Sequence, residues 1–127
     1  MYKLSKRSES RLEGIEPVLI DIVKMAIKDS PYDFGIPSYG GLRTAEDQKY
    51  LYEKGVSKCD GYKNKSYHQS GKAFDIYAFV DGKATWKKEY YFPIAEHIIN
   101  VAKNRFGVDL EWGGTWTNFK DYPHFQI

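Results

Sequence analysis

Three residues of this 127-residue chain are of the types that hold a catalytic metal ion and occur in settings that suit the role. His68 lies in a segment with glycine and many turn-forming residues, and Asp75 follows it inside the otherwise apolar stretch AFDIYAFV. His124 comes near the C-terminus, directly after a proline. Two neutral imidazoles and one carboxylate are a known ligand set for catalytic zinc, which leaves a fourth position open for water. We therefore interpret His68, Asp75 and His124 as a candidate zinc site.

Each of these residue types also has a structural explanation. A buried, ionised Asp75 needs a cationic partner, whereas an Asp75 that faces solvent needs none. A lone histidine is commonly a hydrogen-bonded structural residue, and His97, inside a helical pattern without an acidic or histidine partner at ligand spacing, is interpreted in this way. Cys59 has no second cysteine in the chain, so a free thiol is favoured over a zinc ligand.

The segments that must position these residues predict an α+β fold, in which a small antiparallel sheet is flanked by helices. Capping residues and helical spacing predict helices over residues 3–12, 17–30, 45–55 and 89–106. Runs of β-forming residues predict strands over residues 33–39, 73–80, 110–112 and 125–127, with a hairpin turn at residues 81–82. Residues 56–66 are expected to form a loop. Asp75 is thereby placed on a strand, and Arg43 at a junction between a strand and a helix.

Length and composition limit the classes of protein that need to be considered. A chain of 127 residues closes one core well, so a single domain over residues 1–127 is expected. Basic and acidic residues are nearly balanced, 19 against 17, which argues against a nucleic-acid partner. No stretch approaches the roughly 18 apolar residues of a membrane span, so no membrane insertion is expected. The polar N-terminus does not have the pattern of a secretory signal.

The residues around the candidate ligands resemble the zinc site of the LAS or M15 metallopeptidases. Residues 66–75 fit the pattern S-x-H-x-x-G-x-A-x-D, and Asp121 with His124 fits a later D-x-x-H. The resemblance extends from Ser30 through the G-L-R-T segment that contains Arg43 to the C-terminus. It implies a Hedgehog/DD-peptidase-like fold. A single peptidase domain without a separate cell-wall-binding module looks most like the branch of phage L-alanyl-D-glutamate peptidases that act as endolysins.

This resemblance implies a zinc-dependent endopeptidase that cuts the L-alanyl-D-glutamate bond of the peptidoglycan stem peptide and so lyses the bacterial host. Zn²⁺ held by the three candidate ligands would lower the pKa of a bound water toward about 7. Asp121 would carry the proton from that water to the leaving amine, although many relatives have glutamate there. Arg43 matches the family arginine that stabilises the developing oxyanion. Ser66 could add a hydrogen bond near the ligands.

The resemblance also implies a setting for the enzyme. We expect a monomer that is made in the host cytoplasm, does not insert into the membrane, and reaches the wall through a holin. Its partner would be the peptidoglycan stem peptide.

Two other functions stay open on sequence grounds. A D-alanyl-D-alanine carboxypeptidase would use the same zinc chemistry on a terminal bond, and no pattern in the chain separates the two bonds. A non-catalytic zinc-containing protein, with a wall-binding or structural role, would keep the metal without the reaction. Trp112 and Trp116 could line the cleft, although aromatic residues in so aromatic a chain are more often part of the core.

Overall fold

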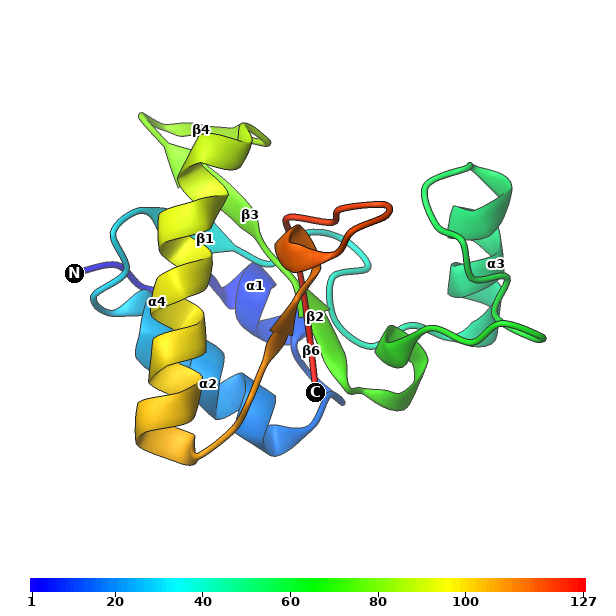
Figure 1. The fold of residues 1–127 in the computed structure, drawn as a ribbon, viewed down its shortest axis with the longest axis horizontal. Helices are drawn as coiled ribbons and strands as arrows, with labels where there is room; N and C mark the ends of the chain where they lie inside the picture. The colour runs from blue at the N-terminus through cyan, green and yellow to red at the C-terminus, as the bar shows by residue number, and fades with distance from the viewer.

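The computed structural model describes residues 1–127 and combines four α-helices, two short 3-10 helices and six short strands (Figure 1). The helices are α1 (Lys6–Arg11), α2 (Pro17–Ile27), α3 (Ala45–Glu53) and α4 (Lys88–Phe106), with η1 (Tyr67–Ser70) and η2 (Gly113–Thr115) as the 3-10 turns. The strands are β1 (Asp33–Gly35), β2 (Ala73–Asp75), β3 (Tyr77–Val80), β4 (Lys83–Thr85), β5 (Glu111–Trp112) and β6 (His124–Gln126). None of the helices is long and apolar enough to cross a membrane. The combination of helices with antiparallel strands is the expected α+β class.

The strands form two antiparallel sheets of three strands each, where one small sheet was expected. One sheet has the order β1-β3-β4 and the other β2-β6-β5. The strand predicted over residues 73–80 divides at Ile76, so that β2 and β3 lie in different sheets. Composition could not locate this division, because Ile76 is a fully buried β-former whose backbone N–H still finds a partner, the carbonyl oxygen of Pro123, at 3.0 Å.

Local signals at the helix ends are confirmed by the backbone. Pro17 occupies the first turn of α2, where its missing N–H costs nothing. Thr44 caps α3 in a reciprocal capping box with Asp47. Gly107 ends α4 in the left-handed conformation that an L side chain resists. The β3–β4 hairpin turns at Asp81 and Gly82, both with positive φ.

The hydrophobic core lies between α2, α4 and the sheets, and it leaves α3 outside. It contains 20 buried residues, none of which lies between Ile36 and Phe74 in the sequence. α3 accordingly stands apart from the body formed by α1, α2 and α4 (Figure 1). The one buried residue of α3 is polar, Gln48. Hydrogen bonds rather than apolar packing therefore attach this side of the molecule.

Tyr91 is the core residue for which pH dependence can be predicted. Its ring is 1% exposed, and its hydroxyl donates to the Thr85 carbonyl (2.8 Å) and accepts from the Ala78 N–H (3.0 Å). Burial raises the pKa of Tyr91 to about 12. Since the unfolded chain ionises this tyrosine near its ordinary pKa of about 10, the folded state loses stability as the pH rises from about 10 to 12.

The Tyr91→Phe variant is expected to lower the free energy of unfolding by about 1–2 kcal/mol near neutral pH, because Ala78 N–H loses its buried acceptor. It should also flatten the alkaline loss of stability. Urea unfolding at a series of pH values measures both effects, with the exposed Tyr62 changed to phenylalanine as the control. An equally steep alkaline loss in Tyr91→Phe would contradict the assignment.

Candidate metal centre

Two of the three candidate ligands come together through the pairing of strands. Asp75 at the end of β2 lies directly opposite His124 at the start of β6, and residues paired in this way point to the same face of a sheet. His68 on η1 reaches the same point from the segment before β2. Asp75 Oδ1 lies 3.2 Å from His68 Nε2 and 3.1 Å from His124 Nδ1, and the two nitrogens are 3.2 Å apart. Three possible ligand atoms thus form a nearly equilateral triangle.

Hydrogen bonds on the far side of each imidazole determine which of its nitrogens faces this triangle. His68 Nδ1 lies 2.9 Å from the carbonyl oxygen of Gly41, which can only accept, so Nδ1 is the donor. His124 Nε2 lies 2.7 Å from Gln126 Oε1, while Gln126 Nε2 donates to Glu111 at 3.3 Å. Both rings are thereby oriented as metal-bound histidines usually are, with the nitrogen that can bind a metal facing inward.

The triangle has the size that a tetrahedral zinc ion requires. Zinc bonds to nitrogen and oxygen of about 2.0–2.1 Å imply ligand atoms about 3.3 Å apart in a tetrahedron. The observed separations of 3.1–3.2 Å match this edge. Three electron-pair donors at such distances repel one another unless a cation or a proton lies between them. The donor set therefore fits zinc, and the three residues that would hold the ion line the cleft.

The charges around the triangle keep Asp75 ionised. Burial raises the pKa of Asp75, but His68 and the hydrogen bond from His124 outweigh it and hold the pKa far below its usual value. Burial lowers the pKa of His124, and the Asp75 carboxylate more than reverses this effect. When no metal is bound, the histidines of the triangle therefore tend to hold a proton. A metal ion must displace that proton, as is usual for histidine ligands.

Arg43 lies beside this centre and is held by three acceptors. Its Nη2 donates to Asp75 Oδ2 at 3.1 Å, its Nε to the carbonyl oxygen of Tyr39 at 2.7 Å, and its Nη1 to Gln48 Oε1 at 3.0 Å. A guanidinium has five N–H groups, so two are left for a ligand in the cleft. The same cation thus neutralises the outer oxygen of Asp75 and faces the space where a substrate would lie.

Gln48 and Gln126 hold residues of the site in place, and no sequence pattern predicted either role. Gln48 accepts a hydrogen bond from Arg43, and Gln126 accepts one from His124. Gln48 is completely buried, and its Nε2 donates to Ser57 Oγ (2.7 Å) and to the carbonyl oxygen of Cys59 (2.9 Å). It therefore joins Arg43 to the loop after α3. A signal for Gln48 exists in hindsight, because it lies three residues before Leu51, on the inward face of a helix with few apolar residues.

Asp121 is close to the centre without joining it. Its backbone N–H donates to the Gly113 carbonyl at 3.0 Å, and its carbonyl accepts from His124 N–H at 3.2 Å. A Cβ at Gly113 would lie 2.2 Å from the Asp121 carbonyl oxygen, so glycine is required for this approach. The Asp121 carboxylate faces the cleft and makes no hydrogen bond or ion pair. Burial, and then the negative charge of Asp75, raise its pKa.

The remaining sequence candidates divide between the site and the scaffold. Ser66 caps η1 by accepting from His68 N–H at 3.2 Å, so it orients the ligand. Trp116 lines the cleft with its ring 5.3 Å from that of His124, whereas Trp112 is buried. His97 lies 2.9 Å from Asp29 and 3.0 Å from the Ala26 carbonyl, which agrees with a structural role.

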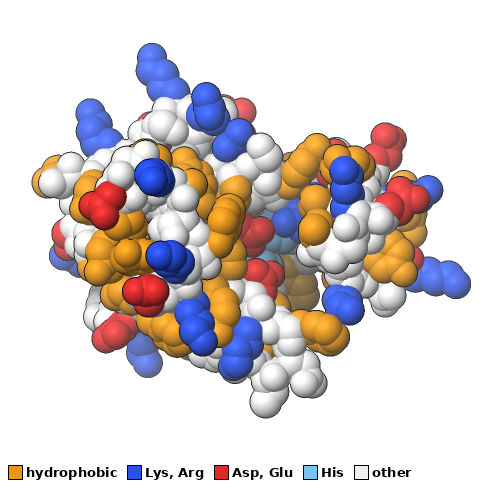
Figure 2. All heavy atoms as spheres, turned by 90° about the horizontal axis from the view of Figure 1, so that it is seen from above, with side chains coloured by type: hydrophobic (Ala, Val, Ile, Leu, Met, Phe, Trp, Pro, Cys, Tyr) orange, Lys and Arg blue, Asp and Glu red, His pale blue; other side chains and the backbone are white.

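The three candidate ligands, Arg43 and Asp121 line one cleft of about 900 Å³ between the body and the α3 side of the molecule. Figure 2 shows this hollow, with histidine at its base and acidic and basic side chains beside it. Arg43 and three lysines, Lys58, Lys65 and Lys120, line its walls. Cys59, the chain's free cysteine, lies partly buried in the same wall. The cleft is thus basic at its sides and holds the candidate metal ligands at its floor.

Comparison with known proteins relates this arrangement to peptidoglycan peptidases. The family model described as phage L-alanyl-D-glutamate peptidase matches residues 1–126. The L-alanyl-D-glutamate peptidase of Escherichia phage T5 is 30% identical over 126 residues, which are 99% of this chain and 89% of the relative. The peptidoglycan L-alanyl-D-glutamate endopeptidase CwlK of Bacillus subtilis is 30% identical over 118 residues, 84% of this chain and 68% of the relative.

A solved structure supports the same relationship. The crystal structure of the L-Ala D-Glu endopeptidase ChiX of Serratia marcescens superposes with a TM-score of 0.83 at 34% sequence identity. The match covers 96% of this chain and 86% of the other chain. The likeness therefore extends over nearly the whole chain rather than over one motif.

Proposed function

Because the chain belongs to the phage L-alanyl-D-glutamate peptidase family, we propose that it is a zinc endopeptidase that hydrolyses the L-alanyl-D-glutamate bond of the peptidoglycan stem peptide. The observation that carries the proposal is the triangle of His68 Nε2, Asp75 Oδ1 and His124 Nδ1, with the separations that tetrahedral zinc needs. The basic walls of the cleft suit a stem peptide, since its D-Glu residue carries a free carboxylate next to the bond to be cut.

In this proposal His68, Asp75 and His124 hold the ion, and two further residues act on the substrate. Bound zinc supplies a Lewis acid that polarises the scissile carbonyl and activates water. Asp121 accepts the proton of the attacking water and returns it to the leaving amine. Arg43 directs its two free N–H groups at the oxyanion that develops on the carbonyl oxygen, and such a donor is worth about 2.7–4 kcal/mol in comparable sites.

We further propose that the enzyme acts as an endolysin. In this role it is a monomer that collects in the host cytoplasm, passes the membrane through a holin, and reaches the wall as one peptidase domain over residues 1–127. The single hydrophobic core supports one domain. The match to the phage T5 enzyme over 99% of the chain supports the phage setting.

The test is the identity of the bond that is cut. Purified protein with zinc is incubated with peptidoglycan, and the products are analysed by mass spectrometry. New L-alanine carboxyl ends and D-glutamate amino ends are expected, and a chelator should stop their formation. Release of D-alanine would instead indicate a D-alanyl-D-alanine carboxypeptidase. Zinc binding without any cleavage would indicate a non-catalytic zinc-containing protein.

A further inference from the structure

Trp86 is a large aromatic residue that the core does not use. It lies in the connection between β4 and α4 and lines the cleft. The residue is 61% exposed. Exposed tryptophan costs free energy in water, about 1.5–3 kcal/mol for a large apolar side chain, unless something covers it. An exposed aromatic side chain at the rim of a cleft is therefore a candidate contact for a ligand.

The ring of Trp86 packs against a core tyrosine, although most of its side chain is exposed. It stacks on Tyr91, with ring centroids 6.3 Å apart and planes inclined by 11°. Tyr91 is itself fixed, because it is buried and its hydroxyl is bonded to Thr85 and Ala78. The backbone N–H of Lys87 donates to Thr85 Oγ1 at 3.3 Å, which holds the turn that carries Trp86. A flat surface is thus prepared before a ligand arrives, which lowers the entropy lost on binding.

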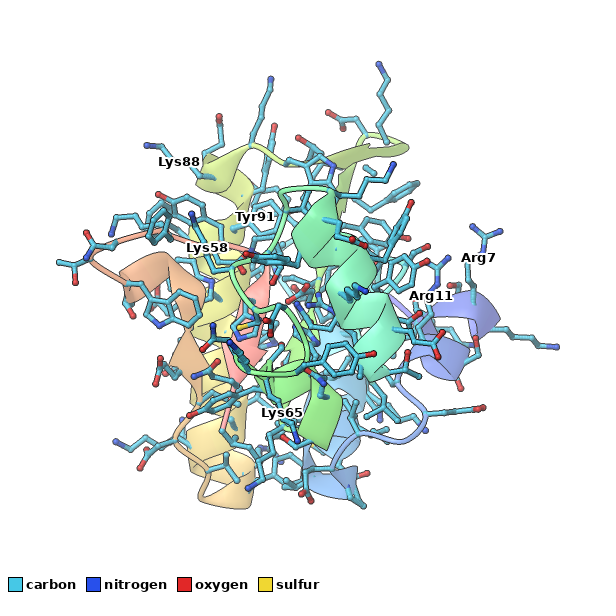
Figure 3. The ribbon with its side chains drawn as sticks, turned by 90° about the vertical axis from the view of Figure 1, so that its right-hand side faces the viewer. Arg7, Arg11, Lys58, Lys65, Lys88 and Tyr91 are labelled. Carbon is cyan, nitrogen blue, oxygen red and sulfur yellow. The ribbon has the colours of Figure 1, made fainter.

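Trp86 and Lys65 lie toward different ends of the cleft, whereas Lys58 lies nearer to Tyr91 (Figure 3). Tyr91, beneath Trp86, lies toward the upper end of this side of the molecule, and Lys65 lies toward its lower end (Figure 3). Trp86 and Lys65 both line the cleft whose floor holds His68 and Asp75. A substrate that crosses the metal centre would therefore meet an aromatic platform at one end and a cation at the other.

The substrate of the proposed reaction has the same asymmetry. On one side of the L-alanyl-D-glutamate bond, the peptide continues with groups that carry carboxylates. On the other side, the alanine nitrogen is joined through a lactyl group to the N-acetylmuramyl sugar. The faces of a pyranose ring present C–H groups, which pack on the negative face of an aromatic ring, whereas carboxylates are attracted to lysine.

On this basis, and resting on the proposed function, we propose that Trp86 is a saccharide-binding platform for the N-acetylmuramyl ring that bears the stem peptide. The enzyme would then read the glycan as well as the peptide. It should cut stem peptides that are attached to sugar better than the same peptides without it.

The first test compares two soluble substrates that differ only in the sugar. One is the disaccharide stem peptide released from peptidoglycan, and the other is the same peptide with a free lactyl group on its alanine nitrogen. We expect kcat/KM of the native enzyme to be about tenfold higher for the glycan-linked substrate, the change associated with one aromatic stacking contact. The difference should lie mainly in KM, since the platform binds substrate and transition state alike.

Variants of Trp86 separate the platform from a structural role. Trp86→Ala should remove the preference by lowering kcat/KM for the glycan-linked substrate about tenfold, with the sugar-free peptide cut as before. Trp86→Tyr should restore most of the preference, because it keeps a flat ring. Phe79→Ala, another exposed aromatic residue that does not line the cleft, is the matched control and should leave both substrates unchanged. Equal losses on both substrates in Trp86→Ala would overturn the proposal.

A binding measurement keeps the platform separate from the peptidase function. The peptide-free disaccharide of N-acetylglucosamine and N-acetylmuramic acid is titrated into the protein, and the indole N–H signals are followed by NMR. The Trp86 signal should shift, while that of the buried Trp112 should stay in place. Absence of a Trp86 shift would overturn the platform even if the peptide bond is cut as proposed. A shift in a protein that cuts no L-alanyl-D-glutamate bond would support the platform and contradict the proposed function.

Discussion

Replacement of His68 by alanine is expected to remove zinc from the protein and to abolish peptidase activity. His68 Nε2 is one corner of the ligand triangle. His68 Nδ1 donates to the carbonyl oxygen of Gly41, so Nε2 is the nitrogen left to bind the metal. Loss of a residue that only orients a zinc ligand costs about 10–100-fold in metal affinity, so loss of a ligand itself should cost more than about 100-fold. Zinc bound per chain, measured by elemental analysis after dialysis against a zinc buffer, checks the prediction.

The third histidine of the chain supplies the control. His97 is partly exposed and bonds to Asp29 and Ala26, away from the cleft, so His97→Ala should keep zinc and activity. The melting temperature gives a second measurement. Zinc at 100 times its dissociation constant should stabilise the native protein by about 2.7 kcal/mol and so raise its melting temperature. The melting temperature of His68→Ala should not change when zinc is added. An unchanged zinc content in His68→Ala would rule out the triangle as the metal site.

The structure brings His68 and Asp75 together, as the sequence predicted, because both are tied to local structure. The spacing of His68 and Asp75 spans one 3-10 turn and one short strand, so the motif itself brings the two side chains together. Arg43 was placed correctly beside a helix start, since Thr44 is an unmistakable cap. His124 depends on a strand pairing with Asp75 that no local pattern specifies. Its place in the site followed from the family order rather than from the residues alone.

The parts that sequence reasoning missed depend on contacts between distant segments. The division of residues 73–80 into two strands arises where Ile76 pairs with Pro123 instead of a sheet neighbour. Gln48 looks like an ordinary polar helix residue until the fold buries it against Arg43. Nothing in a chain with 17% aromatic residues singles out Trp86, whose exposure at the cleft and packing against Tyr91 appear only in the fold. Periodicity reports local geometry and burial on average, so it does not reveal such pairings.

The α3 side of the molecule is attached to the body by polar contacts rather than by the core, and Arg43 takes part in them. No core residue holds this side, and Arg43 links it to the body through Asp75 on one side and Gln48 on the other. The residue proposed to stabilise the oxyanion is therefore also a polar link between the two sides of the molecule.

Asp121 is the remaining group in the cleft with the properties of a proton carrier. Burial raises its pKa, which brings the carboxyl group closer to the working range of a general base near neutral pH. Its carboxylate has no hydrogen-bond partner, so it is free to bind a water. The close contact of its backbone with Gly113 fixes its position relative to His124, the ligand three residues later.

The Asp121→Ala variant is therefore expected to keep zinc and to lose activity by about 10²–10⁴-fold, the usual contribution of a general acid–base group. Asp121→Glu should recover part of this loss, because it restores a carboxylate at a slightly longer reach. Asp109→Asn, an exposed carboxylate outside the cleft, is the control and should match the native enzyme. Zinc content and the rate of L-alanyl-D-glutamate cleavage are measured on the same samples. If Asp121→Ala retains zinc and still cleaves at the native rate, another group must carry the proton, and the cleft offers no second unpaired carboxylate for that role.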